Sequence, residues 1–151
     1  MSRRDEIIMT EAEIADFLAP PRNLQVATIN RDGTPHLVTM YYAVIDDRVA
    51  FWTYRKSQKV LNLQRDPRIT VLVEDGTSYG ELRGVSIAGR ANLSEDREAV
   101  MDIGKRIFVR YFGDLNEATM AGVEASGAKR IAITVEPERV VSWDHRKLGG
   151  T

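Results

Sequence analysis

The pattern of apolar and polar residues predicts that strands dominate this chain. Runs rich in β-branched and aromatic residues occupy residues 23–30, 36–45, 48–54, 68–75, 81–93, 129–137 and 138–144. Short turn sequences separate the first three runs: Asp32 and Gly33 ahead of Pro35, and then Asp46 and Asp47. The pattern therefore predicts a meander of three hairpin-connected strands, followed by four further strands.

Apolar residues at helical spacing predict four helices. These helices cover residues 10–19, 58–66, 95–113 and 115–127. Thr10, Ser57 and Ser94 stand where N-caps are expected, and Thr10 has the spacing of a capping box with Glu13. In the second helix we expect Val60, Leu61 and Gln64 to face inward.

The order of these elements indicates a mainly β (α+β) fold. Strands follow one another through short turns, and helices fill in at the ends, so a β–α–β arrangement is not expected. Gly84 and Gly89 interrupt the fifth strand and predict the bends or bulges that closure of a barrel requires. We predict a closed or split antiparallel β-barrel with peripheral helices, formed by one domain over residues 1–151.

Composition excludes several classes of function. The formal net charge is −1, which argues against a general nucleic-acid binder. The chain contains no cysteine, and its two histidines, His36 and His145, lie in separate segments, so we predict no metal site. The N-terminal residues lack the apolar run of a signal peptide, and no apolar stretch is long enough to span a bilayer. We expect a cytoplasmic location and no membrane partner.

The sequence also lacks the motifs of self-contained catalysis. It has neither a Gly-x-Gly-x-x-Gly fingerprint after a strand nor a phosphate-binding P-loop. Its carboxylates are scattered over turns and helix surfaces, without a persuasive acid–base pair. A bound cofactor that supplies the chemistry therefore fits better than hydrolysis by side chains.

Residues 53–59, with the sequence TYRKSQK, place positive charge where a strand ends and a helix begins. A helix start is the positive end of the helix dipole, so Arg55, Lys56 and Lys59 are unfavourable there unless an anion is bound. A phosphate at this point would meet free backbone N–H groups, the Ser57 hydroxyl and the planar fork of Arg55. A solvated basic surface is the alternative interpretation.

Aromatic residues lie close to this basic junction in the predicted meander. Tyr41 and Tyr42 belong to the second strand, and Trp52 and Tyr54 to the third. Neighbouring strands would bring these rings within reach of the phosphate, although alternation along each strand sends about half of them into the core. Trp143 near the C-terminus suggests that the tail docks over a pocket or a partner subunit.

The motifs DGTPHL, the Lys-x-x-Lys helix start and RDPRITVLVE occur in an order that resembles the pyridoxamine 5'-phosphate oxidase-like split β-barrel family. Within that family the chain is most similar to the flavin/deazaflavin oxidoreductases that use coenzyme F420, and VVSWDHRKL is similar to the ending common there. The resemblance implies an FMN-binding split-barrel type of fold and a homodimer. It also implies a cleft between the subunits that holds a flavin or F420.

The resemblance further implies a set of cofactor-binding residues. These are Val38, Thr39, Met40, Tyr41, Trp52, Thr53, Arg55, Lys56, Ser57, Lys59, Trp143 and Lys147. Arg55, Lys56, Ser57 and Lys59 would hold the phosphate, and residues 38–41 would offer backbone groups to the ring system. Tyr42, or an ordered water, is the candidate proton donor.

The implied function is hydride transfer between F420 and a small conjugated organic substrate. Two alternatives stay open: an FMN-dependent oxidoreductase of the same family, and a non-catalytic protein that binds F420. After Leu148 the chain has only GGT, where pyridoxamine 5'-phosphate oxidase itself continues with a longer basic segment. Vitamin B6 oxidation is therefore not expected.

Overall fold

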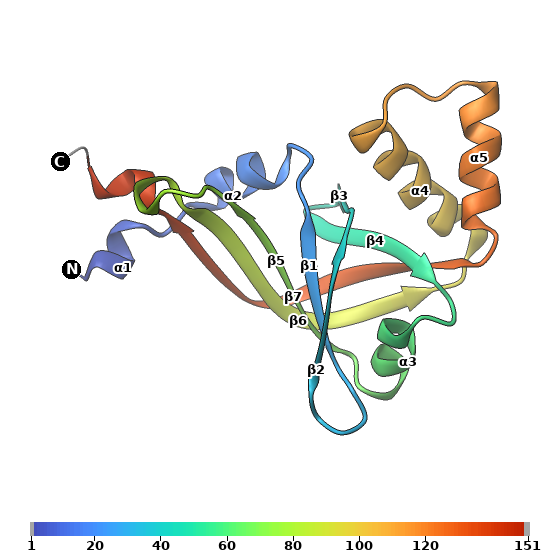
Figure 1. The fold of residues 1–151 in the computed structure, drawn as a ribbon, viewed down its shortest axis with the longest axis horizontal. Helices are drawn as coiled ribbons and strands as arrows, with labels where there is room; N and C mark the ends of the chain where they lie inside the picture. Colours follow the sequence, from blue (N-terminus) through green and yellow to red (C-terminus); the bar gives the residue numbers. More distant parts are fainter. Residues whose placement is uncertain (1, 150–151) are drawn as a thin grey trace.

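In a computed structural model, which describes residues 2–149, seven antiparallel strands form one strongly curled sheet in the order β2-β1-β5-β6-β7-β4-β3 (Figure 1). The strands are β1 (Leu24–Ile29), β2 (Pro35–Met40), β3 (Ala43–Ile45), β4 (Arg48–Tyr54), β5 (Arg68–Asp75), β6 (Arg83–Ser94) and β7 (Arg130–Asp144). The helices are α1 (Arg3–Glu6), α2 (Glu11–Leu18), α3 (Gln58–Arg65), α4 (Arg97–Tyr111) and α5 (Glu117–Gly127), with 3₁₀ turns η1 (Tyr79–Glu81) and η2 (His145–Leu148). The predicted split antiparallel barrel with peripheral helices is confirmed.

Alternating side chains build the core of this sheet. Every second residue of β1 is buried, and β5 repeats the pattern at Ile69, Val71 and Val73. These side chains pack with Phe51 and Ile133 in one apolar cluster inside the curl of the sheet. Helices α4 and α5 lie together on one side of β4, and α3, which follows the end of that strand, lies on its other side (Figure 1).

The predicted strand 36–45 is wrong in one respect, because the chain breaks at Tyr41 and Tyr42. Its first part, β2, pairs with β1, whereas its second part, β3, pairs with β4. Tyr42 is fully buried, and its hydroxyl donates a hydrogen bond to the Leu18 carbonyl at 2.8 Å. The predicted meander is therefore also wrong: β2 and β4 are not neighbours in the sheet, because the chain crosses from one edge to the other at this break.

The two strands predicted over 129–137 and 138–144 are a single strand, β7, which pairs with β6 from Ala132 to Asp144. A bulge absorbs the irregularity: Ala88 pairs with Arg139 and Gly89 pairs with Pro137, so Glu138 is the extra residue. A proline fits at this point because the ladder is locally interrupted there. The bend predicted from Gly89 is confirmed.

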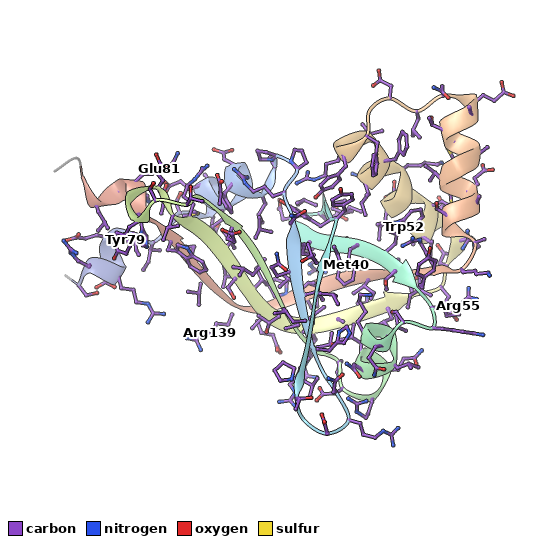
Figure 2. All side chains as sticks on the ribbon, viewed as in Figure 1. Met40, Trp52, Arg55, Tyr79, Glu81 and Arg139 are labelled. Atoms are coloured by element: carbon purple, nitrogen blue, oxygen red, sulfur yellow. The ribbon has the colours of Figure 1, made fainter. Side chains whose placement is uncertain are left out.

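Beyond the barrel, β5, β6 and β7 extend into an arm that carries α1, α2, η1 and η2, with both ends of the described chain beside it (Figure 1). Figure 2 shows Tyr79 and Glu81 on this arm, whereas Met40, Trp52 and Arg55 lie in the other half of the molecule. The arm and the barrel half thus form two separate regions for candidate sites.

The helix starts follow the predictions with one exception. Thr10 and Glu13 form the predicted capping box, and the Ser57 hydroxyl caps α3. The cap of α4 is Asp96 rather than Ser94, because the Asp96 carboxylate accepts the Ala99 N–H at 3.0 Å. In α3 Val60 faces inward as predicted, but Leu61 and Gln64 are exposed, and Leu63 is buried in their place. Among residues 2–149, no helix has the length and apolar character needed to cross a bilayer.

The bulge gives a first testable prediction. A Cβ at Gly89 would stand 1.9 Å from the Glu136 carbonyl oxygen, so Gly89→Ala must displace a backbone strand. We expect the free energy of unfolding to fall by about 1–3 kcal/mol, measured by urea denaturation. Gly80→Ala is the control, since a Cβ there meets nothing within 4 Å; equal effects of the two substitutions would contradict the close approach.

Candidate functional site

The junction between β4 and α3 gathers the cations that the sequence predicted. Ser57 accepts the Val60 N–H at 3.4 Å, while the first two N–H groups of α3, at Gln58 and Lys59, precede the residues that can bond within the helix. Arg55 and Lys56 are exposed in the turn just before the helix. The Arg55 side chain pairs with Glu95 at 3.0 Å, a contact between two exposed groups that water weakens.

The start of β7 adds two further cations to this junction. The Arg55 N–H donates to the Lys129 carbonyl at 2.9 Å, and Tyr54 pairs with Arg130 across the two strands. A cavity of about 390 Å³ is lined here by Tyr54, Arg55, Lys56 and Lys129. The positive charge of residues 55–59 is therefore extended by residues 129 and 130 into a cationic rim.

Lys59 differs from the other cations because it is buried. Its ammonium group donates to the Thr53 hydroxyl at 2.9 Å, and only 8% of the residue is exposed. Burial lowers the pKa of Lys59, and the charge of Arg130 lowers it further. Among the described residues no carboxylate forms an ion pair with Lys59, so its charge is uncompensated in the protein itself.

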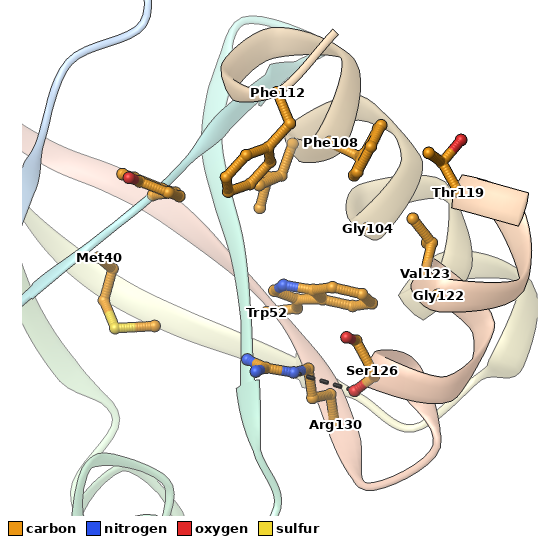
Figure 3. A pocket seen from close by; sticks show the side chains of 12 residues that line it. Met40, Trp52, Gly104, Phe108, Phe112, Thr119, Gly122, Val123, Ser126 and Arg130 are labelled. Atoms are coloured by element: carbon orange, nitrogen blue, oxygen red, sulfur yellow. Dashed lines mark hydrogen bonds between the residues drawn. The ribbon is translucent and has the colours of Figure 1, made fainter. Parts of the chain in front are cut away.

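A second cavity, of about 490 Å³, lies next to the cationic rim and is mostly apolar (Figure 3). Trp52 of β4 forms one wall, and α4 and α5 form the others. Met40, Tyr41, Trp52, Gly104, Ile107, Phe108, Phe112, Thr119, Gly122, Val123, Ser126 and Arg130 line it. We call this cavity the aromatic pocket.

Close packing of helices on Trp52 shapes the aromatic pocket. A Cβ at Gly104 would come within 2.3 Å of the Trp52 ring, and one at Gly127 within 3.1 Å. Glycine at these positions lets α4 and α5 approach the indole face. The Arg130 guanidinium lies on the same indole, 5.1 Å from the ring centroid, and 4.1 Å from the Tyr54 ring.

Tyr41 is held in place at the mouth of the pocket. Its ring stacks on Tyr111 with centroids 4.0 Å apart, and the edge of Phe112 lies 5.8 Å away. Tyr111 is itself fixed, because its hydroxyl donates to the Arg22 carbonyl at 2.6 Å. The break in the predicted strand therefore turns Tyr41 outward into the pocket and Tyr42 inward to the core.

The structure brings together some of the sequence-predicted site residues and separates others. Met40, Tyr41 and Trp52 meet in the aromatic pocket, beside the junction with Arg55, Lys56, Ser57 and Lys59. Strand alternation sends Thr53 to the opposite face from Trp52 and turns Thr39 outward, where its hydroxyl donates to Gln25 at 2.7 Å. Val38 packs against the main core.

Trp143 and Lys147 lie on the arm, away from the aromatic pocket of their own chain. The Trp143 ring is pressed against Gly84, where a Cβ would come within 2.2 Å of it. The Lys147 ammonium donates to the Ile8 carbonyl at 2.8 Å and to Glu13 at 2.7 Å. Within one chain Lys147 fastens the tail to the N-terminal segment, and Trp143 packs on β6.

Tyr42 has a structural position that opposes its candidacy as a proton donor. It is fully buried, its hydroxyl bonds to Leu18, and the Arg110 guanidinium covers its ring at 4.5 Å. Burial raises the pKa of Tyr42, so the proton is held more firmly than in water. The aromatic pocket is lined by Tyr41 and not by Tyr42.

Sequence reasoning missed Lys129, Arg130, Phe108 and Phe112 as site residues. Lys129 and Arg130 fall at the start of the strand predicted over 129–137, and Phe108 and Phe112 fall in the helix predicted over 95–113. The sequence signal that could have indicated Lys129 and Arg130 is that these two adjacent cations directly precede an apolar strand. Their place beside Tyr54 depends on the pairing of β7 with β4, which local spacing does not encode.

Comparison with known proteins establishes the family. The sequence model described as "Pyridoxamine 5'-phosphate oxidase" matches residues 10–144. The chain belongs to this family of split-barrel flavin and deazaflavin oxidoreductases. No curated protein matches the sequence.

Solved structures place the chain among its relatives. The conserved hypothetical protein Rv2991 from Mycobacterium tuberculosis is 44% identical with a TM-score of 0.94, and the match covers 100% of this chain and 94% of that one. A protein described as an F420 reductase is 25% identical with a TM-score of 0.66, over 83% of this chain and 93% of that one. HutZ, a heme storage protein from Vibrio cholerae, shares the fold at 17% identity and a TM-score of 0.68, over 87% and 94%.

The contact between Gly104 and Trp52 gives a prediction for the aromatic pocket. We expect Gly104→Ala to lower the free energy of unfolding by about 1–3 kcal/mol, because the indole must move. Gly122→Ala in the wall formed by α5 is the matched control: its Cβ meets nothing within 4 Å, so helix propensity should stabilise the protein by about 0.5–1 kcal/mol. Urea denaturation measures both, and a stabilising Gly104→Ala would contradict the packing.

Burial of Lys59 gives a prediction on pH. The pKa of Lys59 in the folded chain lies below the value of 10.5 expected for an exposed lysine. Below the folded-state pKa both states are protonated and the cost of burial is constant. Between the two pKa values the unfolded chain binds more protons, so the free energy of unfolding rises with pH.

Lys59→Met should therefore lose this alkaline rise. Urea denaturation at a series of alkaline pH values measures it. Lys56→Met, which removes an exposed ammonium from the same turn, is the control and should keep the rise. A pH dependence that is the same in Lys59→Met and the parent would show that the ammonium is not buried.

Proposed function

We propose that this protein is an F420-dependent oxidoreductase that transfers a hydride between the bound deazaflavin and a small conjugated organic substrate. One observation carries the proposal: a cationic rim at the start of α3 adjoins an aromatic pocket that contains Trp52 and Tyr41. A cofactor with a phosphate at one end and a flat ring at the other would use both features. The 25% identity to a protein described as an F420 reductase supports the same choice.

The phosphate would bind at the junction between β4 and α3. Arg55 offers a planar fork, Lys56 a mobile ammonium, and the first turn of α3 its N–H groups. Lys59 would contribute positive potential from its buried position next to Thr53. A bound anion compensates charges that are otherwise unfavourable at a helix start.

The ring system would lie along β2 and against Trp52. Among the described strands β2 has only β1 as a partner, so the other edge of residues 38–40 presents backbone N–H and C=O groups. Tyr41 offers an aromatic face at the end of that edge. The same groups that make β2 an edge strand can thus bind the polar side of a heterocycle.

Reduced F420 would supply the hydride. The protein would orient cofactor and substrate, exclude water from the aromatic pocket and stabilise developing negative charge with its cationic rim. Because the Tyr42 hydroxyl is committed to Leu18, we propose that water supplies the proton.

FMN is the second candidate cofactor. The family match to pyridoxamine 5'-phosphate oxidase favours it, and the cationic rim and Trp52 suit a terminal phosphate and an isoalloxazine as well. A non-catalytic F420-binding protein is the third candidate, since one fold carries several functions.

We further propose that two copies form a homodimer with the cofactor at their interface. The aromatic pocket is open in one chain, because Tyr41 and Phe112 of its lining are exposed, as is Tyr54 beside it. Trp143 and Lys147 lie on an arm that projects from the barrel, so a second copy is the means by which they could reach a cofactor. The cytoplasmic location stays a prediction from the sequence.

The phosphate site is tested by the double variant Arg55→Gln, Lys56→Gln. We expect F420 to bind at least about tenfold more weakly, because two charge-assisted contacts are lost. The double variant should bind the same deazaflavin without its phosphate almost as tightly as the parent does. Equilibrium titration by fluorescence measures both ligands.

The control is Arg31→Gln, Arg139→Gln, which makes the same change in net charge at exposed positions elsewhere. If the double variant at the junction binds F420 as tightly as the parent, the phosphate site is wrong. Parallel titration with FMN decides the cofactor, since tighter binding of FMN than of F420 would favour the second candidate. Tight F420 binding without turnover of quinones or enones would favour the third.

A further inference from the structure

We infer that the part of the aromatic pocket formed by α4 and α5 binds the organic substrate, and that it selects flat apolar compounds that carry a carboxylate or a similar anion. The inference rests on the proposed function, which places the cofactor along β2 and the junction. The inference adds a class of substrate, and it assigns to Arg130 the distinction between anionic and neutral compounds.

The shape of the pocket favours a flat apolar body. Phe108 of α4, Phe112 at the C-cap of α4 and Val123 of α5 face the cavity together with Trp52 (Figure 3). The volume of about 490 Å³ lies within the range of small-molecule sites, roughly 300–1,000 Å³. Gly122 lines the cavity and has nothing within 4 Å of where its Cβ would stand, so the space opposite Trp52 is open.

The charge of the pocket favours an anion. Of the twelve described lining residues, Arg130 alone is charged. Its Nε donates to the Ser126 carbonyl at 3.0 Å, and its guanidinium rests on Trp52 and Tyr54. The side chain is therefore held in one place.

The terminal nitrogens of Arg130 make no protein hydrogen bond or ion pair among residues 2–149. A fixed guanidinium with free donors at the edge of an apolar cavity suits a bidentate carboxylate. Ser126 of α5 adds a hydroxyl group that can donate to a substrate carbonyl, whereas the Thr119 hydroxyl already donates to the Asn116 carbonyl at 3.3 Å in the cap of that helix.

Arg130 belongs to the cationic rim but lines the aromatic pocket, whereas Arg55, Lys56 and Lys129 line the neighbouring cavity. Tyr54 is in contact with both groups, since its ring lies 4.1 Å from the Arg130 guanidinium and it also lines the cavity of Arg55, Lys56 and Lys129. The cofactor phosphate and the substrate anion would thus have different cations, as two ligands bound side by side require.

A matched pair of fluorescent probes tests the inference without any cofactor. 8-Anilinonaphthalene-1-sulfonate and N-phenyl-1-naphthylamine share the same rings, and only the first is an anion. We expect the full chain to bind the sulfonate at one site per chain, at least about tenfold more tightly than the neutral compound. Equal affinities for the two probes would overturn the preference for anions.

Two variants locate the binding. Arg130→Met should remove the preference for the sulfonate while the neutral probe still binds, which also shows that the variant is folded. Arg139→Met, at an exposed position on β7, is the control for charge and should keep the preference. Gly122→Leu should weaken both probes at least about tenfold by filling the cavity, and Ala121→Leu, exposed on the same helix, should not. Unchanged probe binding in Gly122→Leu would overturn the location.

Titration of F420 into Gly122→Leu separates this inference from the proposed function. F420 affinity within about twofold of the parent supports a substrate pocket distinct from the cofactor site. If the parent binds F420 and Gly122→Leu does not, α4 and α5 hold the cofactor ring. This result would overturn the inference but leave the proposed function intact. A parent protein that binds the probes but neither F420 nor FMN would instead overturn the proposed function.

Discussion

The pairing of β7 with two different strands is the constraint on which the rest of the structure depends. It pairs with β6 from Ala132 to Asp144, and its first five residues, Arg130–Thr134, pair with β4. One strand therefore joins the barrel to the arm. The bulge opposite Gly89 lets this strand change direction between the two regions without losing its partner. Because the pairing with β4 begins at Tyr54 and Arg130, it also places Lys129 and Arg130 at the end of β4, where α3 begins.

Positive charge is concentrated at the end of β4, and one of these charges is buried. Arg55, Lys56, Lys59, Lys129 and Arg130 gather at one end of β4, in a chain whose formal net charge is only −1. Lys59 is buried without an ion pair among the described residues, an arrangement that costs stability in the free protein. Such a cost is typical of functional sites, where a ligand supplies the missing charge. The aromatic pocket beside it is closely packed on one side, because glycines allow two helices to press against Trp52.

Much of the fold and part of the site could be predicted from the sequence. Local periodicity gave the strands and helices, and the capping residues Thr10 and Ser57 marked helix starts within one turn. The resemblance to the family placed Met40, Tyr41 and Trp52 in one pocket, and they do meet there. The sequence analysis expected these aromatic residues to meet because their strands would be neighbours, and that expectation was wrong. β2 and β4 are not neighbours in a meander, and the two tyrosines 41 and 42 are separated by a break that sends one to the pocket and one to the core.

The sequence by itself determined most strand and helix positions, the cationic helix start and the family, because these depend on residues that lie close together along the chain. Only the tertiary structure decided that Lys59 is buried against Thr53, that Trp143 and Lys147 lie on the arm, and that Arg130 meets Trp52. Arg130 and Trp52 are far apart in the sequence, and their contact follows from the order of strands in a curled sheet. That order is fixed by the burial of the whole core rather than by the spacing of any one segment.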